Sequence, residues 1–562
     1  MSKFTIYQVL PRLFGNYNNT RKQHGSIEEN GCGKFNHFTD KALSEIKNLG
    51  ITHVWYTGII EHATQTDYSS FGIKKDHPGV VKGKAGSAYA IKDYYDVDPD
   101  LAENVEERMA EFEALVQRTH KSGMKVIIDF VPNHVARGYF SDAKPTGVTD
   151  LGQNDHPEWH FSPLNNFYYI PDQSFQPQFD AFGYKEYPAK STGNDQFNAS
   201  PTKNDWYETV KLNYGVNYVE GKQKQFSPTP DTWLKMRDIL LFWGSKNIDG
   251  FRCDMAEMVP VEFWGWVIPQ IKMQYPEIIF IAEVYNPAEY RNFIANGKFD
   301  YLYDKVGLYD KLRDVTSHNH PVRNITNCWQ ALNGIEDHML NFLENHDEQR
   351  IASGFFSGNG MYAQPAMIVA ATLTKAPVMI YFGQELGEQG MDNEGFSGVD
   401  GRTSIFDYWS LKTIQAWANN GKFDGANLSD EQKDLRDFYQ KLLHICLNEK
   451  AITKGVMYDL EYANLDNNFF NSHEQFAYFR KYEDELLLIV LNFHDVALET
   501  KIKIPFEAFQ YLNIEENSEY SCTDLLNDTD SFKNVAINST SPFYSLIPAW
   551  KGQIFKLTKM QK

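Results

Sequence analysis

Residues 125–134 read KVIIDFVPNH, and this stretch decides how the rest of the chain is interpreted. Its first seven residues form an apolar, β-branched run, which is typical of a strand buried on both faces. Such strands occur in parallel sheets that are covered by helices. The polar residues Asp129, Asn133 and His134 lie at the end of this run, where parallel α/β folds present reactive side chains.

Similar apolar runs recur on both sides of this stretch and alternate with amphipathic segments such as 101–123 and 229–247. Repeated strand–helix units indicate parallel strands. Eight strands without a nucleotide-type glycine loop predict a closed (β/α)₈ TIM barrel rather than an open sheet. The other strand candidates are 4–10, 51–59, 249–254, 277–285, a weak one near 300, 338–345 and 376–383.

The alternation breaks at two places, and these breaks define the expected domains. Residues 135–213 are rich in Pro, Gly, Asn and Asp, and are too long for a plain loop, so we interpret them as an inserted domain. Residues 450–562 contain strand-like runs joined by polar turns, which predict an all-β sandwich. Residues 1–134 and 214–449 then form the two parts of the barrel.

Composition excludes several classes of protein. The 562 residues carry a net charge of −20 and no long basic run, which argues against nucleic acid as a partner. The chain has no apolar run long enough to span a membrane, and its start, MSKFTIYQVLPRLFG, lacks the features of a signal peptide. Five cysteines without a CxxC pair favour free thiols in the cytoplasm and make a zinc site improbable.

The ends of the predicted strands carry a set of groups suited to glycosidic bonds. Asp254, Glu283 and Asp347 converge on one rim if the barrel forms, together with His134, His346 and Arg252. A retaining glycosidase needs one carboxylate as nucleophile and one carboxylic acid as proton donor, about 5–5.5 Å apart. Taken singly, each acid would more often be a helix cap or a solvated loop residue. The occurrence of all these groups at the ends of the predicted strands favours a catalytic role.

Arg252 lies two residues before Asp254, so both side chains point to the same face of the strand. We expect its charge to hold the nucleophile ionised, whereas the proton donor needs a raised pKa from burial and neighbouring negative charge.

These residues belong to motifs that resemble the four signature regions of the α-amylase family, glycoside hydrolase family 13. The motifs occur in the family's order, and the resemblance covers the barrel, the insertion (the family's domain B) and the C-terminal domain. They are DFVPNH (129–134), GFRCDMAEM (250–258), IAEVY (281–285) and FLENHDEQR (342–350).

The resemblance implies a role for each matching position. Asp254 resembles the nucleophile, Glu283 the general acid/base, and Asp347 the third carboxylate, which stabilises the transition state. The other positions are implied to surround the sugar: Tyr89 as its stacking partner, with His134, Arg252, His346 and Arg350 close by. No organic cofactor is implied.

The sequence also departs from the family's pattern. Many α-amylases have Lys-His where this chain has Glu257 and Met258, so the substrate contact on the leaving-group side is expected to be looser. Lys211 belongs to a Lys-Leu-Asn segment that is closer to neopullulanases and cyclomaltodextrinases, which hints at short or branched glucans. Asn133 resembles a calcium ligand, but it is neutral and Ca²⁺ prefers carboxylates, so structural calcium stays open.

The sequence therefore predicts a retaining hydrolase of α-glucosidic bonds, mainly α-1,4, in starch, glycogen or maltooligosaccharides. A transglycosylase of the branching or glucanotransferase type uses the same covalent intermediate and remains an alternative. A non-catalytic glucan-binding protein on the same fold is a third reading, against which the three retained carboxylates speak.

Overall fold

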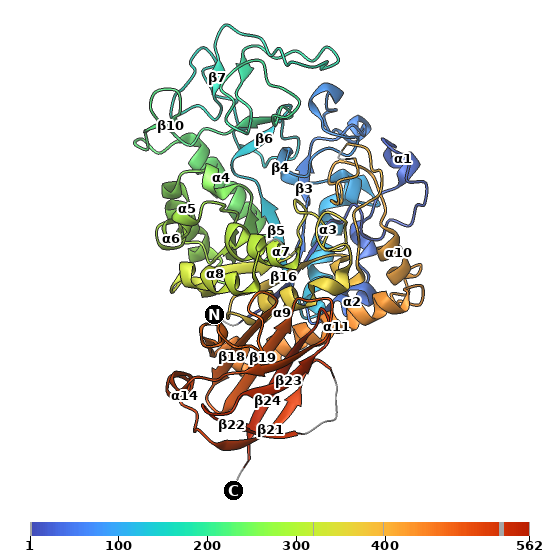
Figure 1. Ribbon diagram of the computed structural model, residues 1–562. Coiled ribbons are helices and arrows are strands. Elements are labelled where there is room, and N and C mark those ends of the chain that lie inside the picture. The colour runs from blue at the N-terminus through green and yellow to red at the C-terminus, as the bar shows by residue number, and fades with distance from the viewer. Residues whose placement is uncertain (1–2, 318–319, 397, 528–532, 561–562) are drawn as a thin grey trace.

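The computed structural model describes residues 3–317, 320–396, 398–527 and 533–560, and its centre is a closed barrel of eight parallel strands (Figure 1). This confirms the predicted fold, including the weak strand near residue 300, which is the three-residue β14. In barrel order the strands are β1 (Thr5–Val9), β16 (Val378–Tyr381), β15 (Met339–Phe342), β14 (Tyr301–Tyr303), β13 (Ile279–Ala282), β12 (Gly250–Cys253), β5 (Lys125–Phe130) and β2 (His53–Tyr56).

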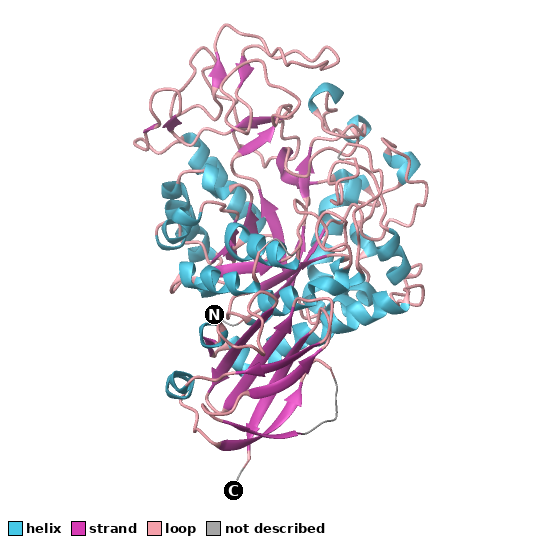
Figure 2. Ribbon diagram, in the orientation of Figure 1, coloured by secondary structure: helices cyan, strands magenta, loops and turns pink. Residues whose placement is uncertain are grey.

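Helices surround the strands (Figure 2). Trp233, Met236, Leu240 and Trp243 recur at helical spacing along α4 and are all buried. The main helices are α2 (Asp40–Asn48), α3 (Arg108–Lys121), α4 (Asp231–Gly244), α5 (Val261–Gln274), α6 (Tyr290–Ala295), α7 (Asp310–Thr316), α8 (Ile325–Leu332), α9 (Gln364–Thr372), α10 (Lys412–Ala418) and α11 (Asp430–Asn448), and the short α1 is Ile27–Asn30.

A hairpin outside the barrel follows the second strand. The predicted strand 51–59 is shorter in the structure, because β2 ends at Tyr56 and the chain then enters β3 (Ile60–His62). β3 pairs antiparallel with β4 (Ile91–Val97), and Tyr89 lies just before β4. The hairpin thus brings an aromatic side chain to the rim of the barrel.

The segment between β5 and α4 forms a loop-rich lobe above the barrel (Figures 1 and 2). Its base is the pairing of β6 (His134–Ala136) with β9 (Thr209–Lys211). The predicted insertion ends at residue 213, but a further hairpin precedes α4 in the structure. The remaining small strands are β7 (Tyr169–Ile170), β8 (Ala189–Lys190), β10 (Val216–Asn217) and β11 (Gln223–Lys224).

The C-terminal domain lies at the opposite end of the molecule from this lobe (Figure 1). A six-stranded sheet and a two-stranded sheet enclose a separate apolar core, so the sandwich is unequal. It also contains short helices, α12 (Lys450–Thr453), α13 (Glu461–Asn464) and α14 (Phe506–Leu512). The six-stranded sheet has the order β17 (Val456–Asp459), β18 (Gln475–Tyr482), β19 (Glu485–Asn492), β24 (Gly552–Lys559), β21 (Ser518–Asp524) and β22 (Lys533–Ile537). The two-stranded sheet pairs β20 (Leu498–Ile502) with β23 (Phe543–Ile547).

A buried arginine joins this domain to the barrel. Arg480 of β18 is 2% exposed and donates hydrogen bonds to the carbonyls of Leu373, Ala451, Ile452 and Gly455. Because Leu373 follows α9 of the barrel, these bonds fix the two domains to each other.

Within the part of the chain that the structure describes, no helix is both long and apolar enough to cross a bilayer. The five cysteines are buried, and their side chains are thiols that form no disulfide bonds with one another.

Candidate functional site

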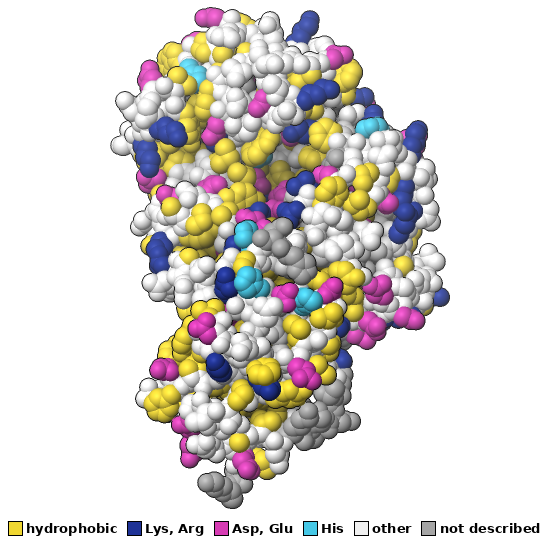
Figure 3. All heavy atoms as spheres, viewed as in Figure 1, with side chains coloured by type: hydrophobic (Ala, Val, Ile, Leu, Met, Phe, Trp, Pro, Cys, Tyr) yellow, Lys and Arg dark blue, Asp and Glu magenta, His cyan; other side chains and the backbone are white. Residues whose placement is uncertain are grey.

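Three carboxylates meet at the carboxyl ends of the barrel strands. Asp254 directly follows β12, Glu283 directly follows β13, and Asp347 comes five residues after the end of β15. This is the rim that the inserted lobe covers, and Figure 3 shows acidic and basic side chains gathered in the hollow below that lobe. The structure thus brings together the three acids that the sequence singled out.

One guanidinium group connects these acids. Arg252 Nη1 donates a hydrogen bond to Asp254 Oδ1 at 2.7 Å, and Nη2 lies 2.8 Å from Glu283 Oε2 in an ion pair. Nη1 also lies 3.5 Å from Asp129 Oδ1. Arg252 is completely buried, and three aromatic rings surround its Cζ atom at 5.3–5.4 Å: Trp55, Tyr89 and Tyr303.

The turn after Asp254 has a strained backbone and donates a hydrogen bond to Glu283. Met255 has φ 42° and ψ 41°, a left-handed conformation that is unusual for a residue with a long side chain. This conformation accompanies a 2.7 Å hydrogen bond from the Met255 N–H to Glu283 Oε2. The other oxygen, Oε1, accepts a 2.6 Å hydrogen bond from the Tyr285 hydroxyl.

The third acid is paired with a neutral histidine. His346 Nδ1 lies 2.8 Å from Gln8 Nε2, an amide donor, so the ring proton is on Nε2. Nε2 lies 3.1 Å from Asp347 Oδ2 without hydrogen-bond geometry. Burial lowers the pKa of His346, and Arg252 lowers it further, so the ring is neutral. The Nε2 proton is therefore available to a ligand.

An aromatic surface lies beside this histidine. The Tyr89 ring stacks on His346 with centroids 5.0 Å apart and an angle of 24° between the planes. The His134 ring lies 5.2 Å from Trp206 of the inserted lobe. Burial lowers the pKa of His134 to about 3, so it too is neutral and can exchange hydrogen bonds with hydroxyl groups.

Comparisons with known proteins agree with this geometry. The family "Alpha amylase, catalytic domain" matches residues 8–437. The chain belongs to the α-amylase family.

Two relatives and one solved structure show the extent of the similarity. α-Amylase 3 of Dictyoglomus thermophilum is 24% identical over 87% of this chain and 85% of its own length. Neopullulanase 2 of Thermoactinomyces vulgaris is 21% identical over 87% of this chain and 68% of its own length. The structure of the Geobacillus thermoleovorans α-amylase, solved with acarbose, has a TM-score of 0.64 at 19% identity and covers 99% of both chains.

The charge state of Asp254 differs from the expectation. Burial raises the pKa of Asp254 well above its usual range, and although Arg252 lowers it, the negative charge of Glu283 raises it again. The expected net lowering by Arg252 is therefore wrong for the empty site, because removal from water outweighs the ion pair.

Asp347 also titrates above the usual range for a carboxyl group. Its enclosure in the cleft and the charge of Glu283 raise its pKa, whereas Arg252 lowers it. Since 44% of its side chain stays accessible, solvent moderates these effects.

Two residues that were expected near the substrate, Arg350 and Glu257, form hydrogen bonds within the protein. Arg350 is completely buried and donates to Glu344, Thr403 and the carbonyl of Phe382, so it supports the loop after β15 from behind. Glu257 Oε2 accepts hydrogen bonds from the backbone N–H groups of Tyr285 and Asn286.

The residues at Asn133 do not fit a calcium site. Its Oδ1 accepts a hydrogen bond from the ammonium group of Lys211, which forms an ion pair with Asp195 at 2.7 Å. A divalent cation at Asn133 would face this buried positive charge. Among the described residues there is also no group of three or more acidic, histidine or cysteine side chains arranged to hold a metal ion.

Sequence reasoning missed several residues that shape the site. Tyr285 was part of a motif, but nothing in the motif indicated that its hydroxyl contacts Glu283. Arg402 Nε donates to the carbonyl of Asp347 at 2.6 Å from the long loop after β16, which has no regular pattern. Gln8, Trp55 and Tyr303 read as ordinary strand residues.

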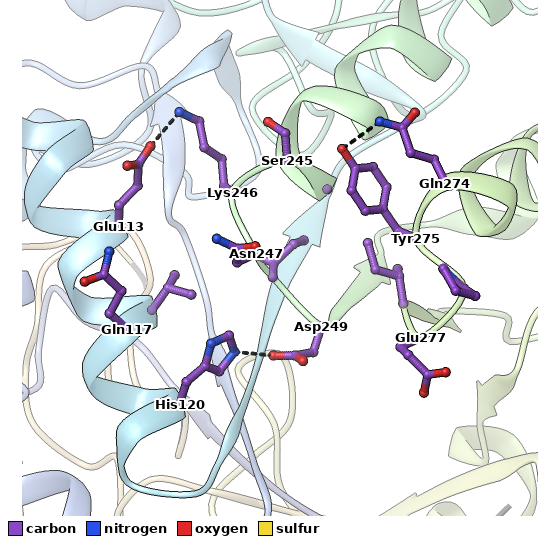
Figure 4. Close-up of a pocket in the computed structure, with 15 residues that line it drawn as sticks. Glu113, Gln117, His120, Ser245, Lys246, Asn247, Asp249, Gln274, Tyr275 and Glu277 are labelled. Carbon is purple, nitrogen blue, oxygen red and sulfur yellow. Dashed lines mark hydrogen bonds and ion pairs between the residues drawn. The ribbon is translucent and has the colours of Figure 1, made fainter.

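A separate groove of about 490 Å³ lies between the ends of α3, α4 and α5, at the amino-terminal side of β12 and β13 (Figure 4). Two pairs of its charged side chains contact each other, His120 with Asp249 at 2.7 Å and Lys246 with Glu113 at 2.6 Å. Because Asp254 and Glu283 follow the other ends of these strands, this groove is not part of the same site.

The raised pKa of Asp254 predicts a stability that depends on pH. The folded protein keeps the Asp254 proton to higher pH than the unfolded chain, where the pKa is about 3.9, so stability is lost as pH rises above that value. We expect Asp254→Asn to remove this loss and to raise the melting temperature at pH 7. The gain should disappear below about pH 4, where both states are protonated.

Differential scanning calorimetry from pH 4 to 8 measures this effect, with Asp466→Asn at the surface as the matched control. Equal or lower stability of Asp254→Asn at pH 7 would show that attraction to Arg252 outweighs burial.

Proposed function

We propose that this protein is a retaining glycoside hydrolase that cleaves α-glucosidic bonds, mainly α-1,4, in starch, glycogen or maltooligosaccharides. The observation that carries the proposal is the sharing of the Arg252 guanidinium by Asp254 and Glu283, at 2.7 and 2.8 Å. A retaining mechanism needs its two carboxyl groups about 5–5.5 Å apart, whereas an inverting one leaves room for a water molecule between them. Contact with two nitrogens of one guanidinium group keeps Asp254 and Glu283 near each other, which supports the retaining mechanism.

In the reactive form of the enzyme, the proton of the carboxyl pair lies on Glu283 and Asp254 is ionised. In the first step, Asp254 then attacks the anomeric carbon while Glu283 gives its proton to the glycosidic oxygen. The bond between that oxygen and the anomeric carbon breaks, and the glucan beyond it leaves with the proton. In the second step, Glu283 takes a proton from water, which attacks the anomeric carbon and releases Asp254. Arg252 balances the negative charge that moves between the two acids.

The surroundings of the acids support binding of a sugar ring at the cleavage point. The Tyr89 ring offers an apolar face, and neutral His346 offers the Nε2 proton, which forms no hydrogen bond with the residues that the structure describes. Asp347 and His134 add polar groups for ring hydroxyls. Asp347 lies in the same cleft and provides negative charge for a transition state that resembles an oxocarbenium ion.

Short or branched glucans suit the leaving-group side. Glu257 faces the backbone, and Met258 is apolar, so neither supplies the charged hydrogen bonds of a Lys-His pair. The similarity to a neopullulanase agrees with such a substrate range.

Glu283→Gln tests the assignment of the proton donor. The amide keeps the size of the side chain but gives no proton, so kcat on maltoheptaose should fall by at least about a thousand-fold. Tyr184→Phe, in the inserted lobe, serves as a control for the expression and handling of variants. If Glu283→Gln keeps more than about a tenth of wild-type kcat, Glu283 is not the donor.

Product analysis on maltoheptaose separates hydrolysis from transfer. A hydrolase releases shorter oligosaccharides whose new reducing ends are first formed as the α-anomer, as NMR would show. Longer oligosaccharides as the main products would support the transglycosylase instead. No product of either kind would refute both readings.

We infer that the Lys211 ammonium group takes the place of a metal ion between the barrel and the lobe. Treatment with a chelator should therefore leave kcat and the melting temperature unchanged. Lys211→Met should lower the melting temperature, since it leaves the buried Asn133 oxygen without a donor. A loss of activity on chelation that calcium reverses would contradict this inference.

A further inference from the structure

The loop after β13 carries a chain of hydrogen bonds that ends on Glu283. Glu257 Oε2 accepts from the backbone N–H of Tyr285 at 3.1 Å and from that of Asn286 at 3.0 Å. The Tyr285 hydroxyl then donates to Glu283 Oε1 at 2.6 Å. We propose that Glu257 and Tyr285 are positioning residues that fix the oxygen of Glu283 that carries the transferred proton, an inference that rests on the proposed function.

The contacts of Glu283 leave one oxygen for catalysis. Oε2 already accepts from the Met255 N–H at 2.7 Å and lies 2.8 Å from Arg252 Nη2. Two donors already occupy the lone pairs of Oε2, whereas Oε1 accepts from one donor and keeps a lone pair for a proton, so the transferable proton belongs on Oε1. The Tyr285 hydroxyl lies on this oxygen and so contacts the atom that exchanges the proton with the substrate.

Tyr285 acts on Glu283 as a permanent donor. Burial and the negative charge of Glu283 both raise the pKa of Tyr285, which therefore keeps its O–H proton throughout the working range of the enzyme. A donor of this kind stabilises the carboxylate form of Glu283 more than the acid form.

The other charged groups around Glu283 come from three strands. Arg252 lies on β12, and Asp254 is the first residue after that strand. Asp347 follows β15, and the titratable side chain of Tyr303 lies on β14. Arg252 favours the carboxylate form, whereas Asp254 and Asp347 favour the acid form. The Tyr285 hydroxyl supplements Arg252 in this balance.

The hydrogen bonds that Glu257 accepts fix the backbone of the loop that carries Tyr285. The residue lies in the turn after β12, so its hydrogen bonds join that turn to the loop after β13. A lysine at this position would be a donor and could not accept from two N–H groups. The Oε2 atom of the acidic residue that distinguishes this chain is thereby used within the protein.

The pH dependence of kcat/KM on maltotriose tests the pair. The alkaline limb of this profile reports loss of the proton from the acid. Removing the hydroxyl with Tyr285→Phe should move that limb upward by about one pH unit, because a hydrogen bond to the carboxylate is lost. Glu257→Ala should move it in the same direction by releasing the loop.

Three further variants make the test specific. Glu257→Gln keeps an oxygen acceptor for both N–H groups and should keep the alkaline limb of the wild type. The double variant Tyr285→Phe/Glu257→Ala should shift no further than Tyr285→Phe alone, because both changes act through one bond. Tyr184→Phe removes a tyrosine hydroxyl that donates to Glu186 outside the site and should leave the profile unchanged.

An unchanged limb in Tyr285→Phe would overturn the proposal. Equal increases in KM for Glu257→Ala and Glu257→Gln, with no shift of the alkaline limb of the kcat/KM profile, would also overturn the proposal. That result would show that Glu257 contacts the substrate and does not position Tyr285.

A readout without substrate separates this inference from the proposed function. The carboxyl ¹³C signal of Glu283, assigned by its absence in Glu283→Gln, can be followed through a pH titration by NMR. An upward shift of its midpoint in Tyr285→Phe supports the pair even if the wild type hydrolyses no glucan, and an unchanged midpoint refutes the pair whatever the activity.

Discussion

The site depends on the complete burial of the Arg252 guanidinium. A buried cation is costly unless carboxylates and hydrogen bonds compensate it, and here the partners are Asp254, Glu283 and Asp129. These acids come from three neighbouring strands, β12, β13 and β5, and the strand register sets their heights: Arg252 lies opposite Asp129 and Ile281. Pairing of these three strands therefore also assembles the two main acids around Arg252.

Much of this arrangement could be predicted, because it follows from local sequence. A strand that is buried on both faces is recognisable from its composition, and a residue that follows a parallel strand must lie on one particular rim. Asp254, Glu283 and Asp347 satisfied both conditions, so their convergence followed from their positions. Even the weak strand near residue 300 was indicated by the need to complete eight units.

The remaining features depend on partners that are distant in the sequence. Whether Glu257 faces the substrate or the backbone is decided by the loop after β13, 28 residues away. Lys211 meets Asn133 only because β9 pairs with β6. The raised pKa of Asp254 reflects how thoroughly the finished fold excludes water, and no motif encodes that quantity. Similarly, Arg350 belongs to a signature region but is enclosed by Glu344 and Thr403.

The most direct test of this account is the pre-steady-state kinetics of Arg252→Lys on an aryl maltooligosaccharide, which separates glycosylation from deglycosylation. Lysine keeps the positive charge, but a single ammonium group lacks the planar fork that contacts Asp254 and Glu283 at once. If one arginine serves both acids, both steps should slow by at least about ten- to a hundred-fold, the loss expected for a charged hydrogen bond. Slowing of only one step, or rates close to the wild type for both, would contradict the account.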